Sequence, residues 1–318
     1  MEVRAFDPAD AEAWDAFCDA SYMSTLLHTR RFLSYHGSRF EDASLIFTEN
    51  GAWMGVLPAA RDPNDPLAAV SHPGATYGGI VHAGELRGEK MLAALQLAKD
   101  FYAGAGYRRV LYKALPRIYH RSPAEDDLYA LFRIGAQRIR CDLSCAVDLR
   151  SRLPLSQRRR RSLKKAHAAG VRVEEGLGCC TALWEVLSDN LQRKHGATPV
   201  HTLAEIQLLQ ERFPDEIFFI AGMVEGVVEG GVVLFETAAV SHAQYIAASQ
   251  RGYDASVLDA VFDYCLERAT RMGKSYFDFG ISNELQGQVL NEGLYRFKSE
   301  FGGGGIVHEF YEIRLNGE

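Results

Sequence analysis

The same order of predicted elements occurs twice in this chain of 318 residues, and that duplication limits the fold more than any other feature. In the first copy a strand (42–48) and a turn (49–51) lead into a second strand (52–60). A glycine-rich loop (71–81), a helix (85–103) and a further strand (107–114) follow. The second copy has three strands (217–224, 228–236 and 238–248), then a helix (254–272) and a last strand (274–280). A repeated order of elements predicts two similar modules.

The position of the helices in this order indicates the type of sheet. Each long helix connects two strands as a single crossover, which favours mixed sheets over purely antiparallel ones. We therefore predict an α/β (α+β) fold with modules over 1–150 and 151–318. A basic helix over 156–170 should link them, with Ser156 as its N-cap and Gly170 at its end. Two unrelated α+β domains are the alternative.

Composition excludes several classes of protein. The formal net charge is −6, which does not suit a general nucleic-acid or membrane binder, although it allows a local basic patch. No apolar run reaches the ~18 residues of a membrane span, and the N-terminus lacks a signal-peptide pattern. These features predict a cytoplasmic protein without a membrane span. The six cysteines form no CxxC pair, so we expect free thiols and no metal site.

The linking helix contains an unusual concentration of positive charge. Six cations lie within eight residues of it, namely Arg158, Arg159, Arg160, Arg161, Lys164 and Lys165. Like charges this close on a helix repel each other by a few tenths of a kcal/mol per pair. An anion nearby would offset this repulsion, which makes Arg161 and Lys164 candidate phosphate-binding residues and 158–165 a candidate contact with tRNA. A solvated or salt-bridged helix is the alternative.

Three segments carry motifs that can be compared with known proteins. The linking segment has Ser156, Arg160, Lys164, Lys165, Ala166, Gly170, Val171 and Val173. The tail has Phe277-Asp278-Phe279-Gly280, then Tyr295-Arg296-Phe297-Lys298 and Phe301-Gly302. The first half has Ser71-His72-Pro73 and Tyr77-Gly78-Gly79. Together they resemble the FemAB-like proteins of the GCN5-related N-acyltransferase (GNAT) superfamily. The resemblance implies two tandem acyl-CoA N-acyltransferase (GNAT)-like modules with mixed sheets.

The resemblance also implies an activity, which is the transfer of an acyl or aminoacyl group to an amine. The donor would be an acyl-CoA, such as acetyl-CoA, or an aminoacyl-tRNA. The acceptor would be the amine of a small molecule or glycan precursor, in cell-envelope or polysaccharide precursor metabolism. Acyl-CoA binders hold the pyrophosphate in a loop of the form Gln/Arg-x-x-Gly-x-Gly/Ala before the long helix. Here that loop departs from the pattern, because Gly252 comes one place early and Asp254 adds a negative charge. A non-catalytic binding protein with a degenerate acyltransferase fold is therefore an alternative function.

Two residues of the tail are candidate catalytic groups, in an active site expected in the second module. Asp278 ends a predicted strand, and its carboxylate could accept the proton of the amine or hold the ammonium. Its alternative role is to fix a neighbouring loop. By the resemblance, Lys298 matches the tail lysine of the family, which would contact the donor or stabilise the oxyanion. An exposed lysine on a short helix is the alternative.

Five further residues are candidates for binding the substrate: Tyr77, His72, Arg30, Arg296 and Tyr253. Tyr77 lies in a loop whose glycines let a ligand approach the backbone closely, so it could stack on a sugar or a base. His72 and Arg30 could add polar contacts, and Arg296 is a phosphate candidate. Packed, structural roles for the loop tyrosine and the histidine are the alternative. The four glycines at 302–305 are predicted to form a flexible hairpin.

Overall fold

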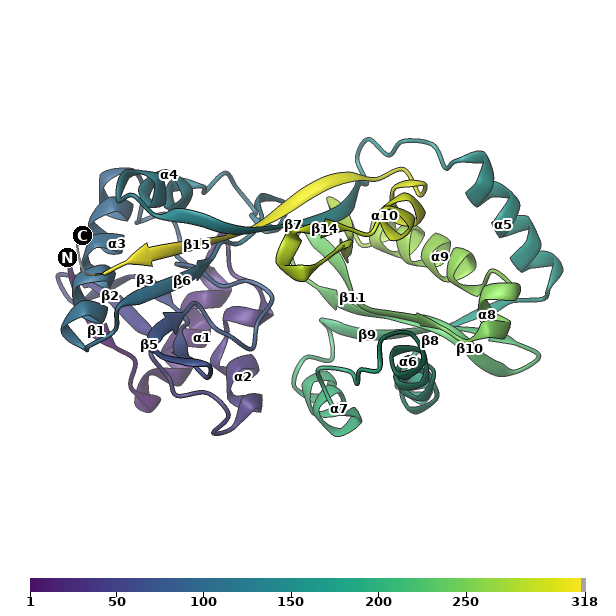
Figure 1. Ribbon diagram of the computed structural model, residues 1–318, viewed down its shortest axis with the longest axis horizontal. Coiled ribbons are helices and arrows are strands. Elements are labelled where there is room, and N and C mark those ends of the chain that lie inside the picture. The colour runs from purple at the N-terminus through teal and green to yellow at the C-terminus, as the bar shows by residue number, and fades with distance from the viewer. Residues whose placement is uncertain (316–318) are drawn as a thin grey trace. The chain divides into compact units, whose positions relative to one another are not determined.

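The computed structural model divides the chain into two compact units (Figure 1). It describes residues 1–315, and of Lys194 and His195 the backbone alone. Unit 1 comprises Met1–Asp142, Leu285–Val289 and Val307–Glu318. Unit 2 comprises the remaining segments, which are Leu143–Glu284 and Leu290–Ile306.

These units differ from the predicted ranges 1–150 and 151–318 because two long strands contribute to both of them. Strand β7 (Gln137–Asp148) begins in unit 1 and ends in unit 2, and β15 (Gly304–Arg314) runs the other way along the chain. The last residues therefore return to unit 1 instead of completing unit 2. A sequence pattern that is read along the chain does not reveal such a return, since it depends on which strands pair.

Unit 1 contains two sheets. The smaller sheet is antiparallel, in the order β1 (Glu2–Ala5), β2 (Leu45–Glu49) and β3 (Ala52–Leu57). The larger sheet begins with β4 (Ala60–Asp62), β5 (Asp65–Val70) and β6 (Arg109–Lys113) and continues to β15 and β7. Strands β5 and β6 are parallel, whereas β6 and β15 are antiparallel. This sheet is mixed, as the sequence predicted.

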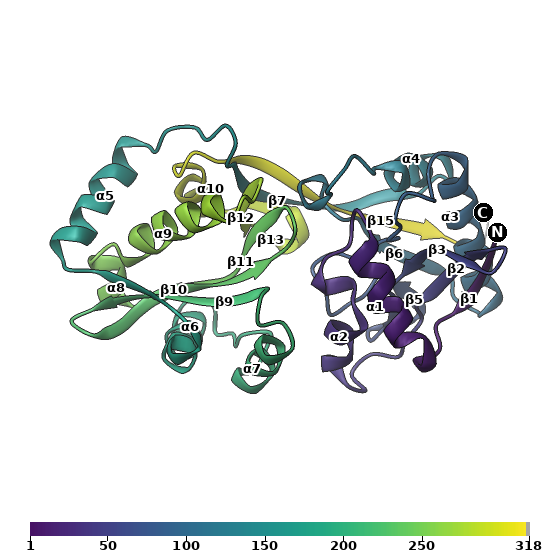
Figure 2. The ribbon, with the colours of Figure 1, turned by 180° about the vertical axis from the view of Figure 1, so that it is seen from behind.

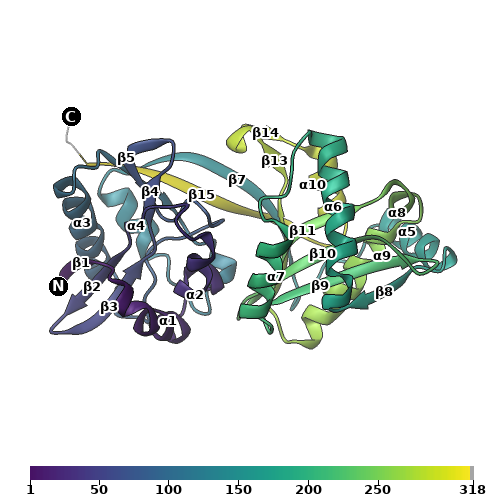
Figure 3. The same ribbon diagram turned by 90° about the horizontal axis from the view of Figure 1, so that it is seen from below.

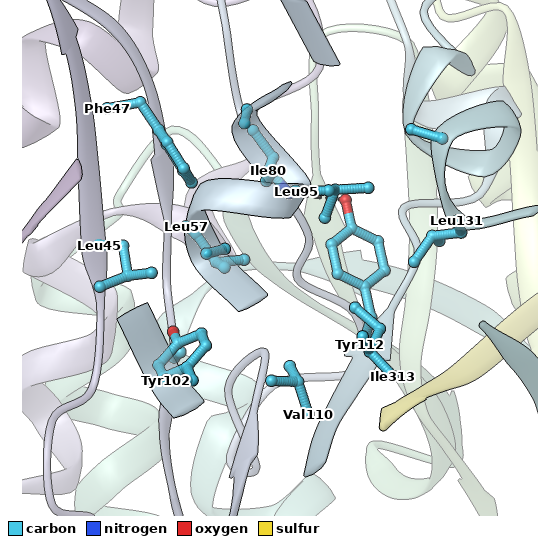
Figure 4. Close-up of a cluster of buried hydrophobic side chains, with 14 of the residues drawn as sticks. Leu45, Phe47, Leu57, Ile80, Leu95, Tyr102, Val110, Tyr112, Leu131 and Ile313 are labelled. Atoms are coloured by element: carbon cyan, nitrogen blue, oxygen red, sulfur yellow. Dashed lines mark hydrogen bonds between the residues drawn. The ribbon is translucent and has the colours of Figure 1, made fainter. Parts of the chain in front are cut away.

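The described residues of unit 1 form four α-helices, namely α1 (Ala11–Ala20), α2 (Arg30–Leu33), α3 (Glu89–Gly104) and α4 (Asp126–Arg133). Short 3₁₀ turns lie at Pro8–Asp10, Leu26–His28, Ser34–His36, Arg117–Tyr119 and, from the tail, Leu285–Gly287. Figure 4 shows the core, where side chains from β2, β3, α3, β6, α4 and β15 converge. Burial of this apolar surface is the main source of stability of the unit.

The larger sheet, which has ten strands in the described part of the chain, continues into unit 2. From the end of β7, its order is β12 (Tyr276–Ile281), β11 (Val240–Ala248), β10 (Val227–Glu236), β9 (Ile217–Val224) and β8 (Arg172–Glu175). Strands β11 and β12 are parallel, and the other neighbouring strands of this unit pair antiparallel. The small strands β13 (Asn283–Glu284) and β14 (Val289–Leu290) form a separate hairpin.

Helices cover both faces of this sheet. Helix α9 (Val257–Arg271) lies on one face, and α6 (Cys180–His195) and α7 (Leu203–Arg212) lie on the other (Figures 1 and 3). The predicted linking helix is α5 (Gln157–Ala168), but it lies wholly within unit 2, since the chain crosses between the units in β7. Helix α5 packs along α9 on its outer side (Figure 2). The remaining helices of unit 2 are the short α8 (Gln250–Asp254), the 3₁₀ turn Leu177–Cys179 and α10 (Glu292–Ser299).

The duplicated order of elements is present in the structure. In unit 1 helix α3 connects the parallel strands β5 and β6, and in unit 2 helix α9 connects the parallel strands β11 and β12. Two details differ from the prediction. The predicted strand 52–60 is broken after Leu57 because Pro58 removes a backbone donor. The strand β5 was missed because a tight turn, where Asp62 pairs with Asp65, resembles an irregular loop in sequence.

The four glycines at 302–305 do not form the predicted hairpin, because Gly302 and Gly303 pack against neighbouring segments and the exposed Gly304 and Gly305 begin β15. Gly302 has a φ of +94°, and a Cβ added to it would lie 2.1 Å from the carbonyl oxygen of Leu153. A Cβ on Gly303 would lie 2.9 Å from the Cys145 sulfur. The glycines therefore allow the start of β15 to approach its neighbours closely.

Phenylalanine rings form the centre of the unit 2 core, and this cluster gives a first prediction. Phe262 of α9 is fully buried, and its ring centroid lies 4.7 Å from that of Phe279 and 5.4 Å from that of Phe301. We expect Phe262→Ala to lower the free energy of unfolding by about 3–5 kcal/mol, because it leaves a cavity. Urea denaturation followed by circular dichroism measures this loss.

Phe132→Ala is the matched control, because Phe132 is 76% exposed on α4. We expect it to change the free energy of unfolding by less than about 0.5 kcal/mol. Equal effects of the two substitutions would contradict the assignment of the unit 2 core.

Candidate functional site

The site in unit 2 is built where the parallel strands β11 and β12 part. In the described residues, their register runs from Val240↔Tyr276 to His242↔Asp278. Strand β11 continues its pairing with β10 as far as Ala248. Strand β12 shifts register against β7 between Asp278 and Ile281, at a bulge where Gly280 has a φ of +76°. The two strands therefore diverge directly after the Asp278 level.

Asp278 lies at this point with its carboxylate inside the protein. Its side chain is fully buried, and one oxygen, Oδ1, accepts hydrogen bonds from the Ser144 hydroxyl and from the Gly280 N–H at 3.0 Å. The other oxygen, Oδ2, lies 3.0 Å from Nδ1 of His242. These donors satisfy a buried carboxylate, which would otherwise be costly. Ser144, Asp278 and His242 thus form a polar row across β7, β12 and β11.

Lys298 of α10 reaches the same bulge from the helix. It is 3% exposed, and its ammonium donates to the carbonyl oxygens of Gly280 at 2.9 Å and of Ile281 at 2.6 Å. Asp278 and Lys298, the two predicted catalytic residues, are therefore brought together at Gly280, one on its N–H and the other on its carbonyl. The lysine is not the exposed side chain of the alternative interpretation.

Burial changes the acid–base properties of the groups around this bulge. It lowers the pKa of Lys298 to about 8, because the ammonium is disfavoured away from water, while the negative charge of Asp278 acts in the opposite direction. It also raises the pKa of the Cys145 thiol on β7 to about 12, so that this thiol stays protonated. A lysine with a pKa near 8 is still mostly cationic at neutral pH.

In unit 1, the loop that follows the parallel pair β5 and β6 is hydrogen-bonded onto β6, so these strands do not part. After the parallel pairing of β5 with β6, the backbone N–H of Ser71 donates to Leu111 and that of Gly78 to Lys113, each at 2.9 Å. The Lys113 ammonium donates to the carbonyl of Ala75, and burial lowers its pKa to about 7. The loop after β5 is thus bonded onto β6, where unit 2 has diverging strands.

Three of the predicted substrate-binding residues lie in unit 1. Arg30 is buried, with its guanidinium 3.4 Å from the ring centroid of Phe6, and it forms an ion pair with Asp42. His72 is buried, and burial holds its pKa well below the usual value. Tyr77 is also buried, with its ring 4.9 Å from that of Tyr119. These are the contacts of packed side chains, although Arg30 and His72 both line a shallow hollow of about 280 Å³.

The other two lie in unit 2. Tyr253 of α8 is 40% exposed, and its hydroxyl accepts from the Asn190 amide at 3.3 Å. Arg296 is exposed on α10, on a different side from Lys298. The structure does not bring Arg296 to the bulge at Gly280.

One cation of the basic helix α5 forms ion pairs inside the protein. Arg159 is buried, and it donates to Asp259 at 2.8 Å and to Glu300 at 3.0 Å. Arg161 and Lys164 are exposed, as are Arg158, Arg160 and Lys165. A hollow of about 300 Å³ beside α5 and α8 is lined by Arg158, Arg159, Ser162 and Tyr253, among others, so the predicted pair Arg161 and Lys164 lies outside its lining.

The loop before α9 is folded as the short helix α8. The N–H groups of Gly252 and Tyr253 bond to the side chain and the carbonyl of Ser249, at 2.9 and 3.0 Å. The N–H of Ser256 bonds to the carbonyl of Tyr253 at 3.1 Å. Arg251 is paired with Glu225 at 2.5 Å. These amides and this cation are occupied within the protein, which agrees with the departure of the loop from the acyl-CoA pattern.

Sequence reasoning missed His242 and Ser144. Both are single polar residues within strands, at 242 and 144, and neither belongs to a motif. Only the pairing register of β7, β12 and β11 reveals them, because it places one residue on each side of Asp278. Among the described residues, no group of three or more His, Cys, Asp or Glu side chains is placed to hold a metal ion. The helices described here include none long and apolar enough to cross a membrane.

Comparisons with known proteins agree with this geometry. The sequence model of the acetyltransferase (GNAT) domain matches residues 155–299. The structure is similar to that of FemX, with a TM-score of 0.70, 13% identity, and 99% of this chain and 98% of the other covered. It is similar to L-PGS from Bacillus licheniformis, with a TM-score of 0.64, 13% identity, and 99% and 94% covered. Curated protein sequences give no match.

A tandem GNAT protein from the clavulanic acid biosynthesis pathway is also similar, with a TM-score of 0.54, 10% identity, and 100% and 99% of the chains covered. These likenesses confirm the predicted fold of tandem GNAT-like modules with mixed sheets, and the resemblance to FemAB-like proteins. The domain match to most of unit 2 indicates an acyltransferase, the class of enzyme that the sequence predicted.

The lowered pKa of Lys298 predicts a pH effect on stability. Between pH 8 and 10.5 the unfolded chain binds more protons at this lysine than the folded protein does, so stability should rise with pH. Lys298→Met removes this contribution. We expect the unmodified protein to gain about 2–3 kcal/mol relative to Lys298→Met across this window. Urea denaturation of both proteins at several pH values tests this, and parallel curves would contradict it.

Proposed function

We propose that the chain transfers an aminoacyl or acyl group to an amine at the parted strands of unit 2. Amide formation needs a neutral amine, a polarised carbonyl and a proton acceptor. The carbonyls of Gly280 and Ile281 take two of the three N–H donors of the Lys298 ammonium. The third can meet the oxygen of the donor's carbonyl and stabilise the negative charge that develops there. A cation held in a dry site is well suited to this task.

The donor we propose is an aminoacyl-tRNA. The observation that carries this choice is the helix α8, whose internal hydrogen bonds occupy amides that an acyl-CoA pyrophosphate would need. The exposed cations of α5 offer a second, independent contact for a phosphate backbone. An acyl-CoA, such as acetyl-CoA, is the second candidate, because the hollow beside α8 is lined by Arg158 and lies at the start of α9.

The acceptor we propose is the amine of a small molecule or glycan precursor of the cell envelope. This rests on the resemblance to FemAB-like proteins, whose acceptors include peptidoglycan precursors. The predicted cytoplasmic location suits both such a precursor and a charged tRNA.

Donor specificity is tested with the purified chain and two sets of substrates. Aminoacyl-tRNAs and acyl-CoAs carrying labelled acyl groups are each mixed with amine acceptors, and amide products are followed by mass spectrometry. We expect product with aminoacyl-tRNA and none above background with acyl-CoA. Product with acyl-CoA alone would favour the second candidate. Ligand binding without turnover of either donor would contradict the enzymatic proposal and favour a non-catalytic binding protein.

The contact with tRNA is tested by removing charge from α5. We expect Arg161→Gln combined with Lys164→Gln to reduce the slope of log affinity for tRNA against log salt by about 1 to 2, because fewer counterions are released. Arg87→Gln combined with Arg108→Gln is the control, since it removes the same charge from exposed positions of unit 1. An equal change in slope for the two double variants would contradict a specific role of α5.

A further inference from the structure

Asp278, the proton acceptor suggested by its motif, is enclosed by donors. Its side chain is 0% exposed, and its oxygens meet the Ser144 hydroxyl, the Gly280 N–H and His242. A substrate amine would have to displace one of these donors to reach it, which would leave a buried polar group unpaired. The carboxylate is therefore placed to act on a neighbouring side chain and not on the substrate.

We propose that His242 is the catalytic proton acceptor of this site and that Asp278 is its positioning residue. The proposal rests on the proposed function, since it assigns a step of that reaction. Parallel register places His242 directly beside Asp278 on the same face of the sheet. The side chain of His242 is 12% exposed, whereas that of Asp278 is fully buried. The histidine is thus the outer member of the pair.

The position of the imidazole agrees with this role. A Cβ added to Gly280 would lie 3.6 Å from Cε1 of His242, so the ring edge lies against the bulge. The carbonyl of Gly280 holds the Lys298 ammonium at 2.9 Å. The proton acceptor and the cation for the oxyanion therefore lie on two sides of one glycine. Acyl transfer requires this arrangement, because the attacking nitrogen and the carbonyl oxygen belong to the same tetrahedral intermediate.

The contact with Asp278 sets the tautomer of the histidine. An ionised carboxylate 3.0 Å from Nδ1 favours the form with the proton on Nδ1, which leaves the lone pair on Nε2. Ser144 holds the other carboxylate oxygen and so fixes the orientation of Asp278. Similar pairs of a carboxylate and an imidazole orient the base and stabilise the imidazolium in other enzymes.

The proposed transfer uses Lys298 for the oxyanion and His242 for the proton. The neutral amine attacks the carbonyl carbon, a carbon–nitrogen bond forms, and the carbonyl oxygen becomes an oxyanion beside Lys298. The proton on nitrogen passes to Nε2 of His242. The oxyanion then collapses, the carbon–oxygen ester bond to the 3′ end of the tRNA breaks, and the imidazolium returns the proton to the leaving oxygen. An amide and an uncharged tRNA are released, and His242 is neutral again.

Other titratable groups lie near the bulge at Gly280. They are Asp278 on β12, Cys145 on β7, and Lys298 and Tyr295 on α10. Burial raises the pKa of Cys145 and of Tyr295, so both stay neutral below pH 8. Substitution of His242 itself is therefore the decisive comparison.

The experiment compares the unmodified chain with His242→Gln, and uses Glu185→Gln, an exposed change on α6, as the control. We expect His242→Gln to lower kcat by about 10²–10⁴-fold with KM for the acceptor within about twofold. Glu185→Gln should keep the kcat and the KM of the unmodified chain. A rate within about threefold of the unmodified chain for His242→Gln would overturn the proposal.

A second measurement does not depend on turnover, and its main result comes from the unmodified protein. Nitrogen NMR of the imidazole in the unmodified protein reports which ring nitrogen carries the proton. We expect the Nδ1–H form of His242, and its loss in Asp278→Asn. A neutral ring protonated on Nε2 would contradict the proposal. If no donor is turned over, the proposed function fails, and this spectrum still decides whether the pair exists.

Discussion

A short parallel ladder between β11 and β12 fixes the geometry on which the site depends. The described register ends at the level of His242 and Asp278, where a bulge at Gly280 turns β12 away. The bulge exposes an N–H and a carbonyl that a regular ladder would have used. Asp278 takes the N–H and Lys298 takes the carbonyl, so both charges are held by backbone groups of one residue. The backbone groups of the bulge are therefore satisfied by side chains instead of by a neighbouring strand.

Unit 1 has an equivalent parallel ladder, between β5 and β6, but a loop covers its end. In unit 1 the loop after β5 bonds back onto β6, and the buried Lys113 holds the carbonyl of Ala75. Both units thus place a buried lysine near the end of their parallel pair, but the lysine of unit 1 lies on the strand itself, whereas that of unit 2 comes from helix α10. Repetition of a fold therefore does not repeat its chemistry, because the chemistry depends on the segments that come after the ladder.

Much of the fold could be predicted from sequence because it rests on local patterns. Turn residues such as Asn50 and Gly51, and glycines at helix ends, marked the elements and their repeated order. The tail motif also gave Asp278 and Lys298 as candidates, and the structure brings both side chains to Gly280. Pairing between distant strands could not be predicted, and it produces both the return of β15 to unit 1 and the meeting of Ser144 and His242 at Asp278. Within the basic helix, sequence alone did not show that Arg159 is buried by Asp259.

The proposed reaction requires unit 2 to bind the reacting carbonyl between β11 and β12, next to Lys298. A crystal structure with a stable amide analogue of the aminoacylated 3′-terminal adenosine tests it most directly. We predict that the analogue's carbonyl oxygen accepts a hydrogen bond from the Lys298 ammonium beside Gly280. Binding of the analogue in unit 1, or in unit 2 away from Lys298, would contradict the proposed reaction.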